Sequence, residues 1–307
     1  MNRKSRLGRL AAALVLGLSI ATHVAAKDKI VVASKIDTEG SVLGNMILLQ
    51  LEKAGYEVED RIQLGATKIV RTALINGQID VYPEYTGNAA FFFDMADSPV
   101  WKDPAKAYAT AKEKDLAANN LVWLHPADAN NTWAISVRGD LAREQKLATL
   151  DDLSRFLKDG GEIKLAASAE FVESEFALPA FQKAYGFQLS ADQLLVLSGG
   201  NTAATIRAAA LRTNGVNAAM AYGTDGGLSA LDMVVLQDPR NVQPVYEPAA
   251  VIRGEVLKAN PDIGPMIDAI FEKLDLTTLQ RLNADVAVNG LDPKEVAREF
   301  LQSAGLL

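Results

Sequence analysis

The stretch NGQIDVYPEYTG, residues 76–87, predicts where a buried strand stops and a loop begins. Ile79 and Val81 have the apolar pattern of a strand entering a core, and Pro83 is expected to keep that strand from continuing through the middle of a sheet. The Asn-Gly pair before the strand ends a helical stretch, and the Thr-Gly pair after it is typical of a turn. Tyr85 is therefore predicted at a strand end, where an aromatic ring either covers a core or faces a ligand.

A second copy of this pattern lies further along the chain. Residues 205–226, TIRAAALRTNGVNAAMAYGTDG, repeat the order found in residues 68–87, KIVRTALINGQIDVYPEYTG. Each copy has an Arg-containing helical stretch, an Asn-Gly stop, a short strand and then a tyrosine, Tyr85 or Tyr222, followed by turn residues. Two lobes of similar topology would present these two strand ends to each other.

Strands and helices alternate along the chain, which indicates an α/β fold. The stretch over residues 41–55 has the spacing of a helix with one apolar face and a stop at Gly55, and Thr149 is available to cap a helix over residues 149–160. The last third is expected to contain a strand over residues 233–238, a tyrosine-bearing loop over residues 244–253, and helices to the C-terminus. Further strands are predicted over residues 29–35, 56–65, 132–140 and 162–168.

Residues 1–26 have the features of a secretory signal peptide, with four basic residues, a short apolar run and small residues up to Ala26. The run is short for a membrane span, and a structural helix is the alternative. Because the chain has no cysteine, it has neither disulfides nor a lipid anchor on an N-terminal cysteine. We therefore expect cleavage after Ala26 and a mature protein that is free in the periplasm.

The charge and the residue types narrow the function classes. The formal net charge is −7, and it becomes −11 once the four basic residues of the signal peptide are removed. An acidic surface argues against nucleic acids and anionic membranes and favours small cations. Only His125 would remain of the two histidines, so that we expect no metal site, no cofactor and no Cys/His catalytic arrangement. Carboxylate-pair chemistry stays open, because Asp and Glu are plentiful.

Four segments together resemble one family. The segment from VVASK to EYTG, residues 31–87, and the segments AMAYGTD, PVYEPAAVIR and REFLQSAGLL resemble the glycine betaine, choline and related osmoprotectant-binding proteins of ABC importers. The resemblance implies a type II periplasmic-binding-protein fold, with two α/β lobes and the ligand between them. The repeated order of strands and helices, and the return of the chain after residues 233–238, place one lobe over residues 27–129 and 239–307 and the other over residues 130–238. The resemblance also implies a monomer that works with the permease subunits of an ABC importer.

The resemblance supplies candidate ligand-binding residues as well. A quaternary ammonium has no N–H to donate, and proteins hold it between aromatic faces. Matching positions in this chain are all aromatic, although core packing is the alternative for each of them taken alone. Lys35 is expected to meet a ligand carboxylate or hydroxyl, and Asn88 and Asn131 match polar cleft positions. The predicted aromatic box consists of Tyr85, Trp133, Tyr222 and Tyr246. Trp101 and Trp123 are interpreted as packing residues, and Tyr82 is expected either to pack or to point to solvent.

Ser174 marks a departure from the family pattern. Betaine binders of this family have an arginine at the matching position to pair with the ligand carboxylate, and such a pair is among the stronger polar contacts. Here Ser174 stands between Glu173 and Glu175. The main hypothesis is a binding protein for glycine betaine, choline or a similar solute. The alternatives are a binding protein for an amino acid or other zwitterion and, less favoured, an exported carboxylate-dependent hydrolase.

Overall fold

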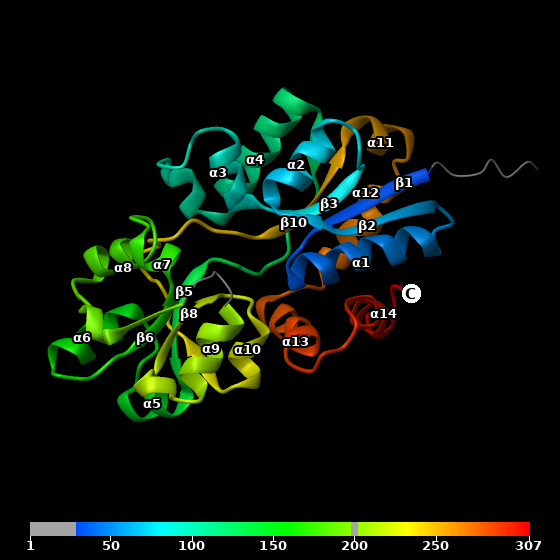
Figure 1. Cartoon of the computed structure of the whole chain (residues 1–307). Coiled ribbons are helices and arrows are strands. Elements are labelled where there is room, and N and C mark those ends of the chain that lie inside the picture. The colour runs from blue at the N-terminus through cyan, green and yellow to red at the C-terminus, as the bar shows by residue number, and fades with distance from the viewer. Residues whose placement is uncertain (1–28, 198–201) are drawn as a thin grey trace, which may run out of the picture.

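The computed structural model describes residues 29–197 and 202–307, and the expected signal peptide lies outside the described residues. The described chain forms two α/β lobes, each built on its own five-stranded sheet (Figure 1). The prediction of an α/β protein with two lobes is confirmed. In the described ranges no helix is both long and apolar enough to cross a membrane.

The sheet of the first lobe has the strand order β2-β1-β3-β10-β4. Strands β1, β2 and β3 are parallel, while β10 runs antiparallel to both of its neighbours. Residues 248–253 were expected in a loop and instead form β10, so the loop prediction is wrong there. The sequence of β10 does not alternate between apolar and polar residues, because this strand is buried on both faces, and it therefore lacks the usual sequence signal of a strand. The strands are β1 (Lys29–Lys35), β2 (Glu57–Gly65), β3 (Val81–Tyr85), β4 (Leu121–Trp123) and β10 (Pro248–Arg253).

Pro83 lies inside β3, between two neighbouring strands, and this contradicts the expectation drawn from it. Its partner in β10 is Ala250, whose carbonyl accepts from Leu124 on the far side. The pair therefore needs no N–H from the proline. On the other side of β3, pairing with β1 is found only at Val81. The proline is tolerated because its nitrogen faces the side where the ladder has already ended.

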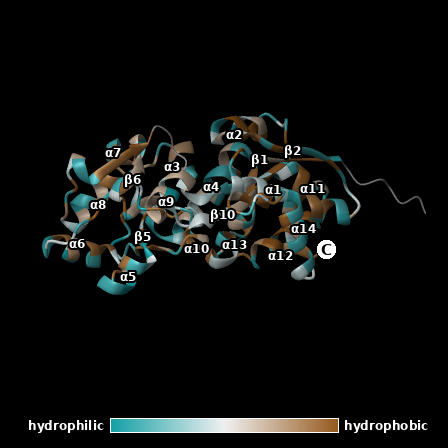
Figure 2. Cartoon of the chain, turned by 60° about the horizontal axis from the view of Figure 1, so that its bottom comes forward, coloured by the Kyte–Doolittle hydropathy of each residue, from teal (hydrophilic) through white to brown (hydrophobic). Residues whose placement is uncertain are grey.

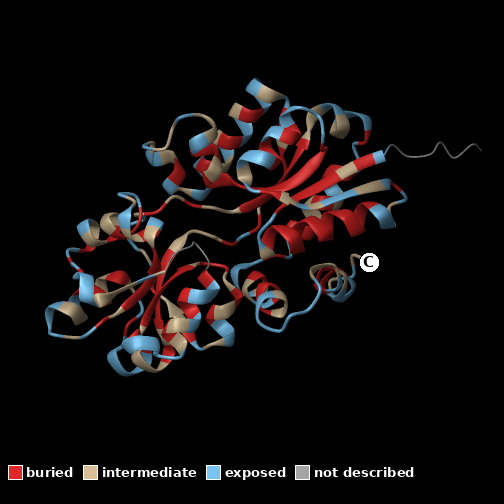
Figure 3. Cartoon of the chain, viewed as in Figure 1, coloured by how far each residue is buried: buried red, intermediate tan, exposed pale blue. Residues whose placement is uncertain are grey.

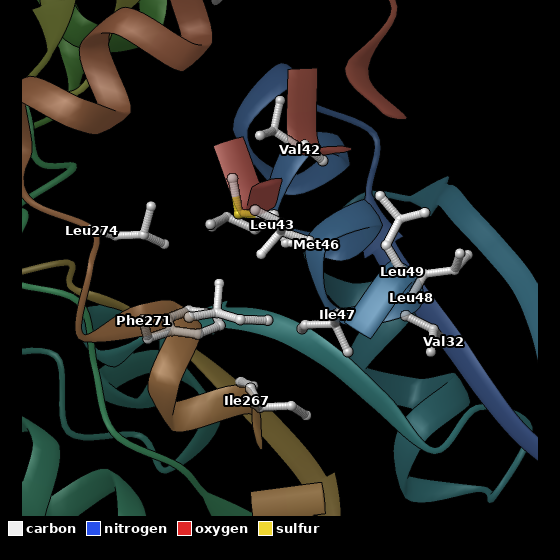
Figure 4. Close-up of a cluster of buried hydrophobic side chains, with 14 of the residues drawn as sticks. Val32, Val42, Leu43, Met46, Ile47, Leu48, Leu49, Ile267, Phe271 and Leu274 are labelled. Atoms are coloured by element: carbon white, nitrogen blue, oxygen red, sulfur yellow. The ribbon is translucent and has the colours of Figure 1, made fainter. Parts of the chain in front are cut away.

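Helix α1 (Thr38–Lys53) is the centre of the first lobe, and it is buried without interruption from Glu39 to Leu51 (Figure 3). The sequence predicted that only one face of this helix would be buried, and the buried surface is instead found on all sides. The sheet covers one side of α1, and three helices near the C-terminus cover the other, so every side is enclosed. Figure 4 shows part of this cluster, including Met46 of α1 with Phe271 and Leu274. An all-round apolar helix is typical of such enclosure.

The second face of this sheet carries a separate cluster. Trp101 and Trp123 are fully buried there, as their interpretation as packing residues predicted.

The helices of the first lobe are α1, α2 (Thr67–Ile75), α3 (Ala89–Phe92), α4 (Pro104–Asn119), α11 (Gly254–Ala259), α12 (Ile263–Phe271), α13 (Leu276–Ala287) and α14 (Pro293–Ser303), with short 3-10 turns at Thr86–Asn88 and Pro99–Lys102.

The sheet of the second lobe has the order β7-β6-β8-β5-β9. Thr149 caps α6 in a capping box with Asp152, as the sequence predicted. Figure 2 shows hydrophilic residues on α5 and α6, at the outer surface. The strands are β5 (Trp133–Arg138), β6 (Leu165–Ser168), β7 (Leu194–Leu197), β8 (Ala218–Tyr222) and β9 (Met233–Val235). The helices are α5 (Gly139–Gln145), α6 (Leu150–Lys158), α7 (Ala169–Glu173), α8 (Leu178–Tyr185), α9 (Thr202–Ala210) and α10 (Gly226–Ala230), with 3-10 turns at Ala191–Gln193 and Thr213–Gly215.

Helix α13 contacts both lobes, α1 in the first and α10 in the second. The approach to α10 is close, because a Cβ on Gly226 would lie 2.0 Å from the backbone nitrogen of Ala284. Asn283, beside Ala284, donates to the carbonyl of Thr224 at 2.8 Å, and Thr224 precedes α10. A helix late in the chain therefore reaches the point where the lobes meet.

Candidate functional site

A cavity of about 740 Å³ lies between the lobes, lined by side chains from both. Seven of the eight candidate residues line it. Those seven are Lys35, Tyr85, Asn88, Asn131, Trp133, Tyr222 and Tyr246.

Strand pairing brings two of the aromatic residues together. Trp133 opens β5 and lies directly opposite Tyr222 at the end of β8. Their rings stack with centroids 6.5 Å apart and an interplanar angle of 22°. Phe171 meets the Trp133 ring edge-on, with centroids 5.9 Å apart at 88°. The tryptophan is therefore held on two sides by other rings, which limits the positions that it can take.

Tyr85 and Tyr246 come from the first lobe and from the segment that returns to it. Tyr85 ends β3 and is paired with Pro248 of β10. Tyr246 lies two residues before Pro248 and is held by two backbone contacts, because its N–H donates to the Asn130 side chain and its carbonyl accepts from Asn131 N, each at 2.9 Å. Burial raises the pKa of Tyr246 to about 12, so its phenol is neutral at physiological pH.

Gly87 allows this position of Tyr246. A Cβ on Gly87 would lie 2.7 Å from two carbons of the Tyr246 ring and 2.8 Å from the carbonyl oxygen of Val245. Contacts below 3 Å force atoms to move, and overpacking of this kind costs about 1–3 kcal/mol. The turn chemistry recognised after Tyr85 thus also makes room for a second ring of the box.

Gly87→Ala should therefore lower the stability of the protein and displace Tyr246 from the cavity. We expect urea unfolding to show a loss of about 1–3 kcal/mol in the free energy of unfolding. Calorimetry should show weaker ligand binding, because the ring of Tyr246 no longer contacts the ligand. Gly264→Ala is the matched control, because a Cβ there meets its neighbours at an ordinary 3.4 Å or more. Equal behaviour of the two variants would contradict the role assigned to Gly87.

Lys35 lies in the cavity, and its ammonium group is already paired. It donates to the carboxylate of Glu84 and lies 4.5 Å from the centroid of the Tyr85 ring. Glu84 is fully buried and also accepts from Asn88 Nδ2, Tyr82 Oη and the Tyr85 backbone N–H, each at 2.7 Å. Tyr82 is accordingly buried and packed. Lys35 and Asn88 thus reach the cavity as members of a network centred on Glu84.

Glu39 was not among the candidate residues from the sequence, although it lies within residues 31–87, the first of the segments that carry the family resemblance. It lies in the first turn of α1, whose N-cap is Asp37. Its carboxylate lines the cavity, is only 4% exposed, and accepts from Tyr85 Oη at 2.8 Å. Burial raises the pKa of Glu39 to about 7, against the opposing effect of its hydrogen bonds.

The lining is acidic. Asp37, Glu39, Glu170 and Asp225 contribute carboxyl groups, and Lys35 is the one cationic side chain among the described residues of the lining. Burial raises the pKa of Asp225 to about 6, which leaves it mostly ionised at neutral pH. A cavity with stacked aromatic faces and an excess of negative charge is suited to an organic cation.

Ser174 does not line the cavity in this structure. It follows the last residue of α7 and its hydroxyl accepts a long hydrogen bond of 3.4 Å from Phe176 N. The residue of α7 that reaches the cavity is Glu170. No guanidinium lines the cavity among residues 29–197 and 202–307.

Two lobes around a ligand-sized cavity are the arrangement of a solute-binding protein. The model of one family, described as the substrate-binding domain of ABC-type glycine betaine transport systems, matches residues 28–303. The chain belongs to this family. Its members are binding components of transport systems and are not enzymes.

Individual relatives agree with this assignment. The chain is 52% identical over 295 residues to the glycine betaine-binding protein YehZ of Escherichia coli, which covers 96% of this chain and 97% of the relative. It is 32% identical to a glycine-betaine-binding protein of Pseudomonas aeruginosa, over 100% of this chain and 96% of the relative. The solved structure of apo YehZ superposes with a TM-score of 0.84 at 53% identity, over 91% of this chain and 99% of that one. The type II binding-protein fold is thus confirmed.

Proposed function

We propose that this protein binds a quaternary ammonium solute, such as glycine betaine or choline, in an aromatic box formed by Tyr85, Trp133, Tyr222 and Tyr246. The observation that carries the proposal is the arrangement of four aromatic side chains from both lobes around one acidic cavity. A cation over such faces gains about 0.5 kcal/mol when exposed and about 2 or more when desolvated. The names of the relatives, which include glycine betaine and carnitine binders, support the same ligand class.

The lobes are proposed to close on the ligand by a hinge motion. We place the first lobe at residues 27–129 and 239–307 and the second at residues 130–238, with crossovers near Ala129 and Asp238. The division of strands between the two sheets supports these boundaries, since β1–β4 and β10 form one sheet and β5–β9 the other. Helix α13 belongs to the first lobe by sequence and contacts both.

Membership of the family supports a cellular role in import by an ABC transporter. We propose that residues 1–26 are removed on export and that the mature protein is a periplasmic monomer that delivers its ligand to the permease subunits of an ABC importer. The signal-like N-terminal sequence and the absence of cysteine support export to the periplasm as a free protein.

The cavity offers few cationic groups to a ligand carboxylate among the described residues of its lining. The ammonium group of Lys35 is shared with Glu84, and position 174 carries a serine outside the lining. Charge-assisted hydrogen bonds contribute about 1.5–3 kcal/mol each. We therefore propose that the trimethylammonium group provides most of the binding energy, and that choline, which has no carboxylate, competes well with glycine betaine.

A ligand panel tests the proposal. Thermal shift and calorimetry with glycine betaine, choline, glycine and proline should show binding by the two trimethylammonium compounds and not by the unmethylated amino acids. Thermal shift detects this binding because a ligand raises the melting temperature by mass action. Binding of proline or glycine alone would favour an amino-acid binder. Turnover of a choline ester by the purified protein would favour the hydrolase instead.

A further inference from the structure

The carboxylate of Glu39 accepts hydrogen bonds from residues far apart in the chain. Oε1 accepts from Tyr85 Oη at 2.8 Å and from Asn131 Nδ2 at 3.2 Å, and Oε2 accepts from Asn283 Nδ2 at 2.7 Å. The side chain of Thr224 provides a further hydrogen bond. These donors belong to β3, the crossover between the lobes, α13 and the loop before α10. One carboxylate thus joins a ring of the aromatic box to the second lobe.

This carboxylate helps to orient the two asparagines. Asn131 Nδ2 donates to Glu39, and Asn283 Nδ2 donates both to Glu39 and to the Thr224 carbonyl. In these orientations Asn131 Oδ1 and Asn283 Oδ1 are buried without a hydrogen-bond partner in the described part of the chain. Leaving a buried acceptor unpaired is unfavourable. The arrangement is therefore favourable only while Glu39 offers acceptors on both of its oxygens, which is the case when it is ionised.

We propose that Glu39 is a positioning residue for the bound cation: its ionised carboxylate holds Tyr85 and links it to the second lobe, so that ligand binding is coupled to release of a proton from Glu39. This inference rests on the proposed binding of a cation in the aromatic box. A proton on either oxygen would point a donor at a phenol O–H or an amide N–H. It would also remove a negative charge from the wall of the cavity.

The pH dependence follows with a definite sign. With a pKa of about 7, Glu39 is partly protonated at neutral pH in the ligand-free protein. A cation in the cavity favours the charged form of a nearby carboxyl group, so it lowers this pKa and drives the proton off. Affinity should therefore fall as the pH decreases below about 7, by at most about tenfold per pH unit for one coupled proton.

Other titratable groups lie in the cavity lining or beside it in the chain, and their protons must be distinguished from the proton of Glu39. Asp37 lies next to Glu39 and its charge raises the pKa of Glu39 further. Lys35 lies over the Tyr85 ring and is paired with Glu84. Asp225, with a pKa of about 6, lies in the loop before α10 and accepts from Tyr222 N at 2.7 Å. Glu247, whose pKa burial also raises to about 7, lies outside the lining.

Calorimetric titrations distinguish these groups. The probes are choline and glycine betaine, whose trimethylammonium groups have no proton to lose. They are titrated at pH 6, 7 and 8, and the titration at pH 7 is done both in phosphate and in Tris. Because the two buffers differ in ionisation enthalpy, the difference in observed heat reports the protons released on binding. We expect wild type to bind several-fold more weakly at pH 6 than at pH 8 and to release up to about half a proton at pH 7, because Glu39 is about half protonated there in the ligand-free protein.

The variants test the assignment to Glu39. Glu39→Gln should bind more weakly at pH 8, with neither a pH dependence near 7 nor a buffer-dependent heat. Asp225→Asn and Glu247→Gln are the controls, and both should still release the proton. Wild type that binds without proton release, Glu39→Gln that still releases a proton, or Asp225→Asn that loses it would each overturn the proposal. The proposal can still be overturned if Glu39→Gln does not fold, because wild type that releases no proton, or Asp225→Asn that loses the release, contradicts it without that variant.

The same titrations distinguish an error in the proposed ligand-binding function from an error in the proposed role of Glu39. If neither compound binds to wild type at any pH, the aromatic-box function is wrong, and so is the proposed coupling to Glu39. If each compound binds with the same affinity at all three pH values, the function stands and the role of Glu39 is wrong.

Discussion

Leucine in place of Trp133 is expected to weaken the binding of glycine betaine or choline by several-fold to about thirtyfold, since a desolvated cation–π contact is worth up to about 2 kcal/mol. Trp133 is partly exposed to the cavity and stacks on Tyr222. Leucine keeps an apolar side chain in this place and removes the aromatic face. The folded state should survive, because the lobe core lies deeper, around residues such as Phe171 and Phe181.

Isothermal titration of Trp133→Leu and of the corresponding Tyr85, Tyr222 and Tyr246 variants measures this effect. Phe176→Leu is the matched control, because Phe176 lies in the same lobe, is half exposed and does not line the cavity. Its affinity should equal that of wild type. Unchanged affinity in all four box variants would contradict the aromatic-box mechanism.

Replacement of Asp115 by asparagine should destabilise the first lobe by about 3–5 kcal/mol, which is the cost of breaking a buried ion pair from one side. Asp115 is fully buried on α4 and makes a two-pronged pair with Arg71 of α2. It also accepts from Trp123 Nε1 at 2.7 Å. Asparagine would leave the guanidinium of Arg71, itself 6% exposed, without a counter-charge.

Urea unfolding followed by tryptophan fluorescence measures the destabilisation. Glu113→Gln is the control, because Glu113 is an exposed carboxylate on the same helix, and its removal should change the free energy of unfolding by less than about 0.5 kcal/mol. Arg71 also lies 4.4 Å from the Phe92 ring of α3, the helix that carries the cavity residue Phe91. Asp115→Asn should therefore also reduce ligand affinity, and a variant as stable as wild type would contradict the assigned role of the ion pair.

Local patterns in the sequence were sufficient for many of the helices and strands, although not for β10. Apolar periodicity placed β1, α2 and β5, and Thr149 marked the start of α6, because spacing and capping act within a few residues. The position of Tyr85 at a strand end followed from turn chemistry on either side of it. The aromatic positions of the cavity came from motifs matched to a family, and they required no knowledge of distances.

Tertiary structure decided the features that depend on residues far apart in the chain. Pro83 fits inside β3 because pairing with β1 ends at Val81, and no local pattern shows where a neighbouring strand stops. Helix α1 is buried on all sides because the last helices of the chain return to cover it.

The site shows the same division. The sequence by itself determined which residues are aromatic, acidic and at the ends of strands. Lys35 could be named from its motif, but its pairing with Glu84, 49 residues away, depends on the neighbouring strands. Glu39 and Asn283 are separated by 244 residues, and their contact exists only because α13 packs against both lobes. Pairing and burial set the charge state and the orientation of these side chains, and both arise only when the chain is folded.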